Sequence, residues 1–236
     1  MISAIVISFF DHDAIKDCLA SLTFVDEVII VGKMDAEVVS ELKHAKPIQF
    51  LESEAVDIDT LIQETRLKTT HDWTIVVEAN KSVSKELSQE VNAIILSENH
   101  NTIFKVKTNF NFMGKLIKFS GYKTSYTPLF FYKNSLLTNA STQILKHPID
   151  ELYLGFDIYN ERLTHRSKQE AQLLYTKNIR PNFIHFLCKP LWKTMTNYIF
   201  KLGFLDGKEG FVLAYLKGFK VFKTYLFLWL LHRNIE

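Results

Sequence analysis

The first hundred residues alternate between short apolar runs and amphipathic segments. Runs such as Ile2 to Ser8 and Trp73 to Val77 have the length of buried strands, and segments such as 14–21 carry apolar residues at helical spacing. The predicted strands are 2–8, 27–31, 47–50 and 73–77, and the predicted helices are 14–21, 35–44, 57–69 and 84–97. This alternation is typical of a parallel sheet wound with helices. We therefore predict a Rossmann-like half whose ligands bind beyond the carboxyl ends of the strands.

The pattern changes after residue 100. Residues 103–132 are basic and alternate like strands, and the chain from Glu161 onward has helical spacing. Near the end, a basic amphipathic pair of helices is interrupted at Gly203 to Gly207. The sequence thus predicts an α/β domain in residues 1–160 and a helical basic extension in residues 161–236.

Charge divides the chain in the same way. The formal net charge is only +2, but residues 1–100 hold 8 Lys and Arg against 18 Asp and Glu, a net −10, which leaves +12 for residues 101–236. Such asymmetry indicates that the basic part faces an anionic partner, either a phosphorylated ligand, an anionic membrane or nucleic acid. The acidic first hundred residues and the lack of a known nucleic-acid module disfavour nucleic acid.

Several classes of protein are disfavoured by what the sequence lacks. No glycine-rich loop follows the first predicted strand, so dinucleotide and P-loop chemistry is not expected. Cys18 and Cys188 have no partner at metal or redox spacing, and both are expected to be core residues in a reducing compartment. We expect neither a signal peptide nor a spanning helix, since the most apolar stretch contains Lys223.

The basic tail is typical of a helix pair that lies in a membrane interface. Residues 181–233 carry eight Lys and Arg against two acidic residues, a net +6, among many Phe, Leu, Trp and Tyr. We expect lysines to bind lipid phosphates and Trp229 to lie at the headgroup boundary. The lysines assigned to this role are Lys193, Lys217, Lys220 and Lys223. The alternative is an ordinary helical hairpin docked on the sheet.

Three segments resemble family-2 glycosyltransferases of the lipopolysaccharide-core type. They are KPLWKTMTNYIFKLGFLDGKEGF (189–211), DWTIVVEANKSVSKEL (72–87) and FNFMGKLIKFSGY (110–122). The resemblance implies a GT-A fold with helices on both faces of the sheet. It also implies transfer of a sugar from a nucleotide-diphosphate donor to a cell-envelope glycan, lipopolysaccharide-core or lipid-linked acceptor. The implied location is the bacterial cytoplasm, peripheral on the inner membrane.

The resemblance also implies a metal site, because a D-x-D motif holds Mg²⁺ or Mn²⁺ against the donor diphosphate. Glu78 and Asn80 stand at the matching positions. Asparagine offers only a neutral amide oxygen, so divalent affinity should be weakened. One hypothesis is that Lys81 substitutes for part of the cation's charge. The alternative is that these residues form a plain solvated loop between a strand and a helix.

Donor-binding residues are expected at the first two strand ends. Ser8, Phe9 and Asp11 lie at the end of the first predicted strand, and Asp11 falls where the family has an acidic residue. The two aromatic rings of Phe9 and Phe10 either stack on a base or close a core. Gly32 and Asp35 follow the second strand, and Asp35 is favoured as a helix N-cap over a ligand contact.

An inverting transferase also needs a general base near the acceptor hydroxyl. The family's acidic position falls on Thr142 and Gln143, neither of which accepts a proton at neutral pH. His147, Asp150 and Glu151 are the candidate bases nearby. His147 is favoured as a surface loop residue.

The acceptor side is basic but lacks the arginine that the family uses to clamp phosphate. Lys115, Lys118 and Lys123 are the candidate phosphate contacts there. In the resembling family, an acidic residue after the second strand contacts the uracil of the donor, and this chain lacks it. The metal pair, this acidic residue, the base and the arginine are thus all altered. Two hypotheses follow: an active transferase with a changed site, or a catalytically inactive glycosyltransferase-like binding module or partner subunit.

Overall fold

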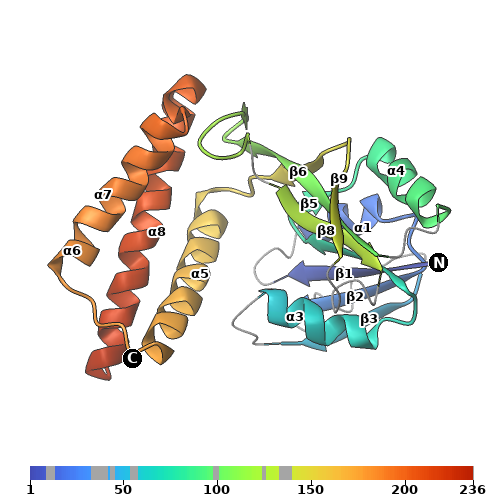
Figure 1. Cartoon of the computed structure of the whole chain (residues 1–236), viewed down its shortest axis with the longest axis horizontal. Helices are drawn as coiled ribbons and strands as arrows, with labels where there is room; N and C mark the ends of the chain where they lie inside the picture. The colour runs from blue at the N-terminus through green and yellow to red at the C-terminus, as the bar shows by residue number, and fades with distance from the viewer. Residues whose placement is uncertain are drawn as a thin grey trace. The chain divides into compact units, whose positions relative to one another are not determined.

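The computed structural model consists of two compact units (Figure 1). Unit 1 comprises Met1–Phe110 and Ser125–Leu154, and unit 2 comprises Asn111–Thr124 and Gly155–Glu236. The residues that the structure describes are 1–8, 14–32, 42, 46–53, 58–97, 101–123, 126–132 and 140–235, with only the backbone described for 58–60. The sequence prediction divides the chain at residue 160, whereas the units divide at 154, and the short segment 111–124 joins the second unit.

Unit 1 is built on a mixed sheet. Its parallel part has the order β3-β2-β1-β4, and antiparallel strands continue it through β8, β6, β10 and β5. The parallel strands are β1 (Ile2–Ser8), β2 (Glu27–Gly32), β3 (Ile48–Glu52) and β4 (Trp73–Glu78). The others are β5 (Lys81–Ser82), β6 (Thr102–Phe112), β8 (Tyr126–Tyr132) and β10 (Ile149–Leu152), while β9 (Ser141–Ile144) and β7 (Lys115–Ile117) pair with β6.

Helices cover both faces of this sheet because β1 is buried on both sides. Ala4 and Val6 of β1 pack in one cluster with residues of α1 (Ala14–Ser21) and α4 (Lys85–Ile95). Ile5 and Ile7 point the other way and pack in a second cluster with Leu61 of α3 (Ile58–Thr65). Successive side chains of a strand alternate between faces, so the two clusters are the two faces of the sheet. The predicted α/β fold with helices on both faces is confirmed.

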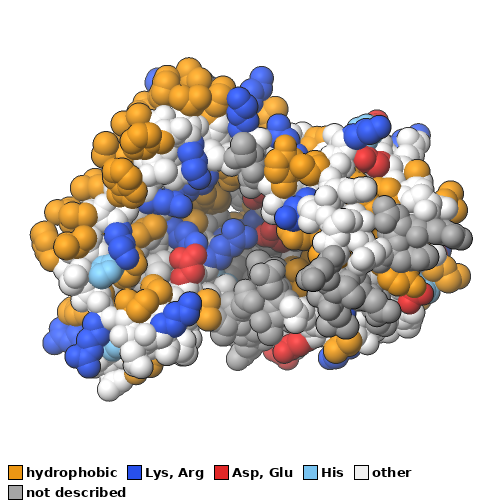
Figure 2. Space-filling view, viewed as in Figure 1, with side chains coloured by type: hydrophobic (Ala, Val, Ile, Leu, Met, Phe, Trp, Pro, Cys, Tyr) orange, Lys and Arg blue, Asp and Glu red, His pale blue; other side chains and the backbone are white. Residues whose placement is uncertain are grey.

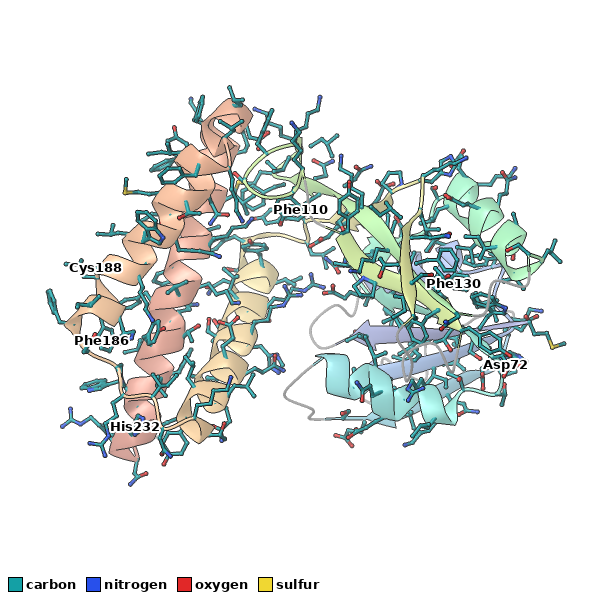
Figure 3. All side chains as sticks on the ribbon, in the orientation of Figure 1. Asp72, Phe110, Phe130, Phe186, Cys188 and His232 are labelled. Carbon is teal, nitrogen blue, oxygen red and sulfur yellow. The ribbon has the colours of Figure 1, made fainter. Side chains whose placement is uncertain are left out.

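Aromatic side chains join the parallel strands to the antiparallel ones. The ring of Trp73 on β4 stacks on Phe130 of β8, with ring centroids 4.6 Å apart, and the ring of Phe104 on β6 lies 5.7 Å from that of Phe130. Figure 3 labels Phe130. All three side chains are buried. The sheet therefore continues across β8 through ring packing in addition to backbone hydrogen bonds.

Most predicted elements are confirmed, with shifted ends. Ser84 caps α4, since its hydroxyl accepts a hydrogen bond from the Leu87 amide at 3.1 Å. The predicted helix over 57–69 ends as an α-helix at residue 65 and continues as a 3₁₀ turn, η1 (Arg66–Lys68). The helix expected at Glu161 begins earlier, at Phe156. The helix predicted over 35–44 lies outside the described residues, apart from residue 42.

Unit 2 is helical and contains the short β-hairpin of residues 111–124. Its elements are α5 (Phe156–Thr176), α6 (Phe183–Phe186), α7 (Cys188–Met195), a π-helical turn η3 (Thr196–Phe200), a 3₁₀ turn η4 (Gly203–Asp206) and α8 (Gly207–Arg233). The predicted interruption at Gly203 to Gly207 is confirmed. Gly218 permits α7 and α8 to pack closely, since a Cβ there would lie 2.0 Å from the Thr194 hydroxyl. No helix of the described residues meets the length and apolarity that crossing a membrane requires.

Asp206 fastens the hairpin to the helices. Its side chain is buried, and its carboxylate accepts hydrogen bonds from the backbone amides of Lys118 at 3.1 Å and Phe119 at 2.9 Å. Its carbonyl accepts a hydrogen bond from Lys115 Nζ at 2.6 Å. Lys217 Nζ also donates to the Ser120 carbonyl at 2.8 Å. These bonds explain why residues 111–124 fold with the helical unit although they interrupt the sheet in sequence.

We predict that Asp206→Ala loosens this hairpin. The variant leaves two backbone amides without their charged acceptor, which costs about 3 kcal/mol of folding free energy. Urea unfolding measures the loss, and hydrogen exchange should show faster exchange of the Lys118 and Phe119 amides. Asp157→Ala, in the exposed first turn of α5, is the control and should lie within about 0.5 kcal/mol of wild type. Unchanged protection of both amides in Asp206→Ala would contradict the assignment.

Candidate functional site

The winding of the sheet reverses between β1 and β4. From β1 the chain proceeds to β2 and β3 on one side, then returns to place β4 on the other side of β1. At this switch point, Ile7 of β1 is paired with Glu78 of β4. Ligands of doubly wound sheets bind outside the carboxyl ends of the strands at such a point.

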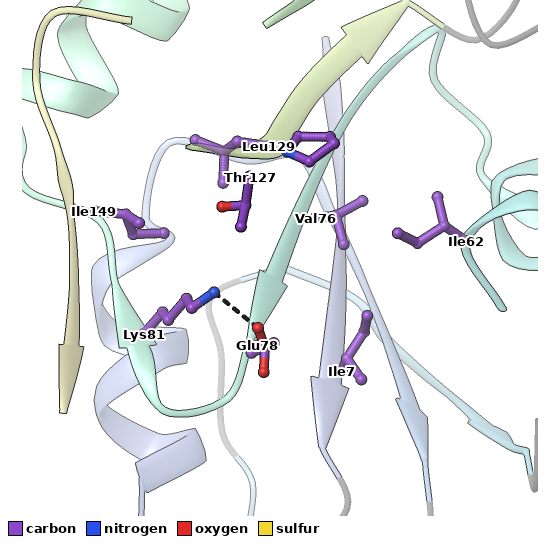
Figure 4. Close-up of a pocket in the computed structure, with 9 residues that line it drawn as sticks. Ile7, Ile62, Val76, Glu78, Lys81, Thr127, Leu129 and Ile149 are labelled. Atoms are coloured by element: carbon purple, nitrogen blue, oxygen red, sulfur yellow. Dashed lines mark hydrogen bonds and ion pairs between the residues drawn. The ribbon is translucent and has the colours of Figure 1, made fainter. Parts of the chain in front are cut away.

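A pocket of about 250 Å³ lies at this position (Figure 4). Its lining comes from β1, β4, β5, β8, β10 and α3 and consists of Ile7, Ile62, Val76, Glu78, Lys81, Thr127, Pro128, Leu129 and Ile149. Most of these side chains are apolar. Glu78 and Lys81 are the charged members, so they are the groups that can recognise a charged part of a ligand in the pocket.

Glu78 and Lys81 form an ion pair across the turn that ends β4. Lys81 Nζ donates to Glu78 Oε1 at 2.7 Å, and Lys81 is only 8% exposed. Lys81 is held by its place in β5, where its Cα is opposite Glu151 of β10. Glu78, the candidate for metal binding, and Lys81, the candidate for donor binding, therefore contact each other, and their opposite charges balance.

Asn80 is buried between these strands. Its Nδ2 atom lies 3.4 Å from Glu151 Oε1 and 3.5 Å from the Leu152 carbonyl, and the Leu152 amide donates to the Asn80 carbonyl at 2.9 Å. Its Oδ1 atom is buried and has no hydrogen-bond partner within the described part of the chain. Asn80 thus connects the turn to β10.

The described residues do not fit a divalent cation at this turn. The Glu78 carboxylate already accepts from an ammonium group, and Asn80 contributes only a neutral oxygen. Within the ranges that the structure describes, no group of three or more His, Cys, Asp and Glu side chains is placed to hold a metal ion. Where the resembling family has the two aspartates of D-x-D, this chain therefore has Glu78, which is paired with Lys81, and Asn80, whose amide is buried.

The three candidate bases are in different environments. Glu151 is adjacent to Asn80, as described above. Asp150 is exposed and its Oδ1 accepts from Asn109 Nδ2 at 3.1 Å. His147 Nδ1 lies 2.9 Å from Glu90 Oε2 on α4. Glu151 is the candidate that the fold brings to the switch-point turn, because the pairing of β5 with β10 places it opposite Lys81.

His147 and Glu90 form a structural connection between α4 and the loop before β10. Glu90 accepts from the backbone amides of Lys146 at 2.8 Å and His147 at 3.1 Å, and from the His147 ring. Burial on its own would raise the pKa of Glu90, but these hydrogen bonds outweigh it and the pKa lies below the usual value. The ring of His147 therefore contacts Glu90, from the loop between β9 and β10.

The donor-side candidates are described only in part. Ser8 is fully buried, and its Oγ atom has no hydrogen-bond partner among the described residues. Gly32 pairs with Ser8 and has φ = 148°, and a Cβ there would lie 1.7 Å from the Ser8 carbonyl oxygen. Glycine is therefore required at this strand end by the approach of β1. Phe9, Asp11 and Asp35 lie outside the described residues.

The predicted phosphate and membrane lysines belong to unit 2, where several bind other parts of that unit. Lys217 contacts the Ser120 carbonyl and the Tyr122 ring, Lys220 pairs with Glu170 on α5, and Lys223 donates to Asn160 and Thr164 on α5. Burial lowers the pKa of Lys223.

Lys115 donates to the Asp206 carbonyl and to Glu209. Lys118, Lys123 and Lys193 are exposed, and Trp229 is 38% exposed with Arg233 over its ring.

No protein-family model matches the chain. Among solved structures, residues 1–349 of TarS from S. aureus align with 100% of this chain and 92% of that one at 12% identity and a TM-score of 0.49. The same TarS region in complex with UDP-GlcNAc gives 10% identity over 100% and 93%, with a TM-score of 0.49. A 4-diphosphocytidyl-2C-methyl-D-erythritol synthase from Anaerococcus prevotii gives 13% identity over 65% and 90%, with a TM-score of 0.43. Likeness at this level concerns the fold and identifies neither substrate nor reaction.

We predict that Glu90→Gln destabilises the protein at neutral pH by about 1–2 kcal/mol, because three hydrogen bonds lose their charged acceptor. The folded-state pKa of Glu90 is depressed, so its contribution is present above pH 4.5 and is lost as the pH falls through the folded-state value. Chemical denaturation of both proteins from pH 7 to pH 3 measures this. The difference should shrink in acid, and a difference that is independent of pH would contradict the assignment.

Proposed function

We propose that this chain is a glycosyltransferase. It takes a sugar from a nucleotide-diphosphate donor and passes it to a cell-envelope glycan, lipopolysaccharide-core or lipid-linked acceptor at the inner face of a bacterial membrane. The supporting observation is the pocket at the β1–β4 switch point, with the Glu78–Lys81 pair in its wall. Glu151 is opposite Lys81 in the β5–β10 ladder. The resemblance of residues 72–87 and 189–211 to family-2 enzymes supports the substrate class.

In the proposed reaction, the acceptor hydroxyl oxygen attacks the anomeric carbon. The bond from that carbon to the diphosphate oxygen breaks, and the nucleoside diphosphate leaves with the bonding electrons. The hydroxyl proton passes to a carboxylate, a role that the proposal assigns to Glu151. The positive charge of Lys81 stabilises the negative charge that develops on the leaving group.

The membrane part of the proposal rests on the exposed apolar side chains of unit 2. Figure 2 shows hydrophobic side chains gathered over α6, α7 and the neighbouring part of α8. Trp192 is 63% exposed and Phe200 is 64% exposed, and the centroids of their rings are 5.9 Å apart. The surface consists of Phe183, Ile184, Leu187, Leu191, Trp192, Met195, Ile199, Phe200, Phe211 and Tyr215. An exposed patch of this kind marks an interaction site.

Charge favours an anionic bilayer as the partner of this surface. Residues 183–205 include three lysines and no acidic residue. Lys193 and Lys201 are exposed, and Lys189 donates to the Tyr225 hydroxyl at 2.6 Å. Aromatic and aliphatic groups with lysines among them suit the boundary between acyl chains and anionic headgroups. The proposed contact is thus made by α6, α7, η3 and the first turns of α8, whereas Lys217, Lys220 and Lys223 of α8, which the sequence suggested for it, bind α5 and the hairpin.

The second candidate is a glycosyltransferase-like binding module without catalysis. The observation that favours it is the ion pair itself, because Lys81 binds the carboxylate that the resembling family uses for its metal. Such a module would hold a glycan or a partner enzyme at the membrane. Nucleotide binding and turnover separate the two candidates.

We predict that at least one nucleoside diphosphate raises the melting temperature by about 5 °C or more at a concentration 100-fold above its Kd. A panel of uridine, cytidine, adenosine, guanosine and thymidine diphosphates in a thermal-shift assay measures this. A flat response to the whole panel would overturn the transferase proposal in favour of the binding module.

For the donor identified in this way, we expect Glu151→Gln to lower turnover by about 10²- to 10⁴-fold while nucleotide binding is retained, because the general base is lost. Release of nucleotide from the corresponding nucleotide sugar measures turnover. Glu161→Gln on exposed α5 is the matched control and should behave as wild type. A large loss in Asp150→Asn with little change in Glu151→Gln would reassign the base to Asp150.

We predict that Trp192→Ser/Phe200→Ser weakens binding to vesicles of phosphatidylglycerol and phosphatidylcholine by about tenfold or more, because two large apolar groups no longer enter the interface. Co-sedimentation measures the binding. Leu67→Ser/Leu96→Ser is the control, since these leucines are 67% and 84% exposed on unit 1. Equal binding by both double variants would exclude the proposed surface.

A further inference from the structure

We infer that this chain binds the diphosphate of its nucleotide without a divalent cation, and that the Lys81 ammonium supplies the positive charge at that position. The inference rests on the proposed function and adds a recognition mechanism to it. The carrying observation is the misfit between the turn that follows β4 and a metal site.

The charge balance of the turn supports the inference. Two carboxylates with a bound divalent cation have a net charge of zero, and a glutamate paired with a lysine also has a net charge of zero. Glu78 and Lys81 are such a pair, with Nζ and Oε1 2.7 Å apart. The turn therefore places an ammonium group at the pocket, and its charge is balanced by the Glu78 carboxylate. In a metal site, the charge of the cation is balanced by two carboxylates in the same way.

The position of Lys81 is fixed by the sheet. Residues 81 and 82 pair with 151 and 150 in an antiparallel ladder, and both Lys81 and Glu78 line the same pocket (Figure 4). Lys81 is 8% exposed, so its ammonium is held at the pocket wall. A charged donor held in place before the ligand arrives recognises a phosphate oxygen with little loss of side-chain entropy.

A cation at the same carboxylate would meet two obstacles. It would approach the Lys81 ammonium, which contacts the same Glu78 oxygen, and the two positive charges would repel each other. Its second ligand would be Asn80, whose amide is 1% exposed, neutral, and packed against Glu151 and the Leu152 carbonyl. Both obstacles lower divalent affinity and leave lysine as the cationic group.

The inference is tested by calorimetric titration of the full-length protein with the nucleoside diphosphate that shifts its melting temperature. We expect the Kd in EDTA to equal that in Mn²⁺ within about twofold. Lys81→Met should weaken binding at least tenfold in both conditions. Lys85→Met, on the exposed first turn of α4, is the matched control and should bind as wild type. Circular dichroism of each variant verifies folding.

A second variant tests whether the turn can be converted into a metal site. Asn80→Asp/Lys81→Ala restores two carboxylates at the turn, and we expect it to bind Mn²⁺ alone in a direct titration, whereas wild type does not. Its nucleotide binding should then require Mn²⁺.

The outcomes are distinct. Wild-type nucleotide binding that requires Mn²⁺, or unchanged binding by Lys81→Met, would overturn the inference and leave the proposed function standing. Absence of nucleotide binding with and without Mn²⁺ would overturn the proposed function as well.

Discussion

β1 is buried along its whole length and pairs in parallel with β2 on one side and β4 on the other. Because its side chains alternate between two apolar clusters, helices have to cover both faces of the sheet. The chain therefore winds outward to β3 and returns across β1 to β4. That return leaves the carboxyl ends of β1 and β4 side by side, and the pocket with Glu78 and Lys81 lies at this junction.

Two of the acidic residues in the first hundred, Glu27 and Glu90, have structural roles. Glu27 is buried, and although burial on its own would raise its pKa, hydrogen bonds from Ser3 and Thr70 outweigh it and lower the pKa. Glu90 has the same role toward residues 146 and 147. These carboxylates join strands and loops to one another, so the negative charge of this half is spread through the fold. At the switch point, Lys81 balances Glu78, and a phosphorylated ligand meets less repulsion than the net charge suggests.

Local patterns predicted the four parallel strands, the start of α4 and the interruption at Gly203, because strand length, helical spacing and the Ser84 cap depend on neighbouring residues. Contacts over long separations could not be predicted in this way. The pairing of β5 with β10 brings Glu151 to Asn80, 71 residues away, and no spacing in the sequence indicates it. Likewise, Lys220 and Lys223 look like lipid-facing cations in sequence, but Glu170 and Asn160 on α5 bind them.

The Glu78–Lys81 pair contributes little to folding by itself. Removing an ammonium and a carboxylate from water costs about as much as their attraction returns, so a partly buried ion pair is weak evidence for stability. The turn is held by other contacts: the β5–β10 ladder and the hydrogen bond from the Leu152 amide to the Asn80 carbonyl. Since backbone contacts hold the turn, the side chain at position 81 can be related to the pocket that it lines. A lysine in that pocket wall is consistent with the proposed nucleoside diphosphate, whose phosphates need a cationic group.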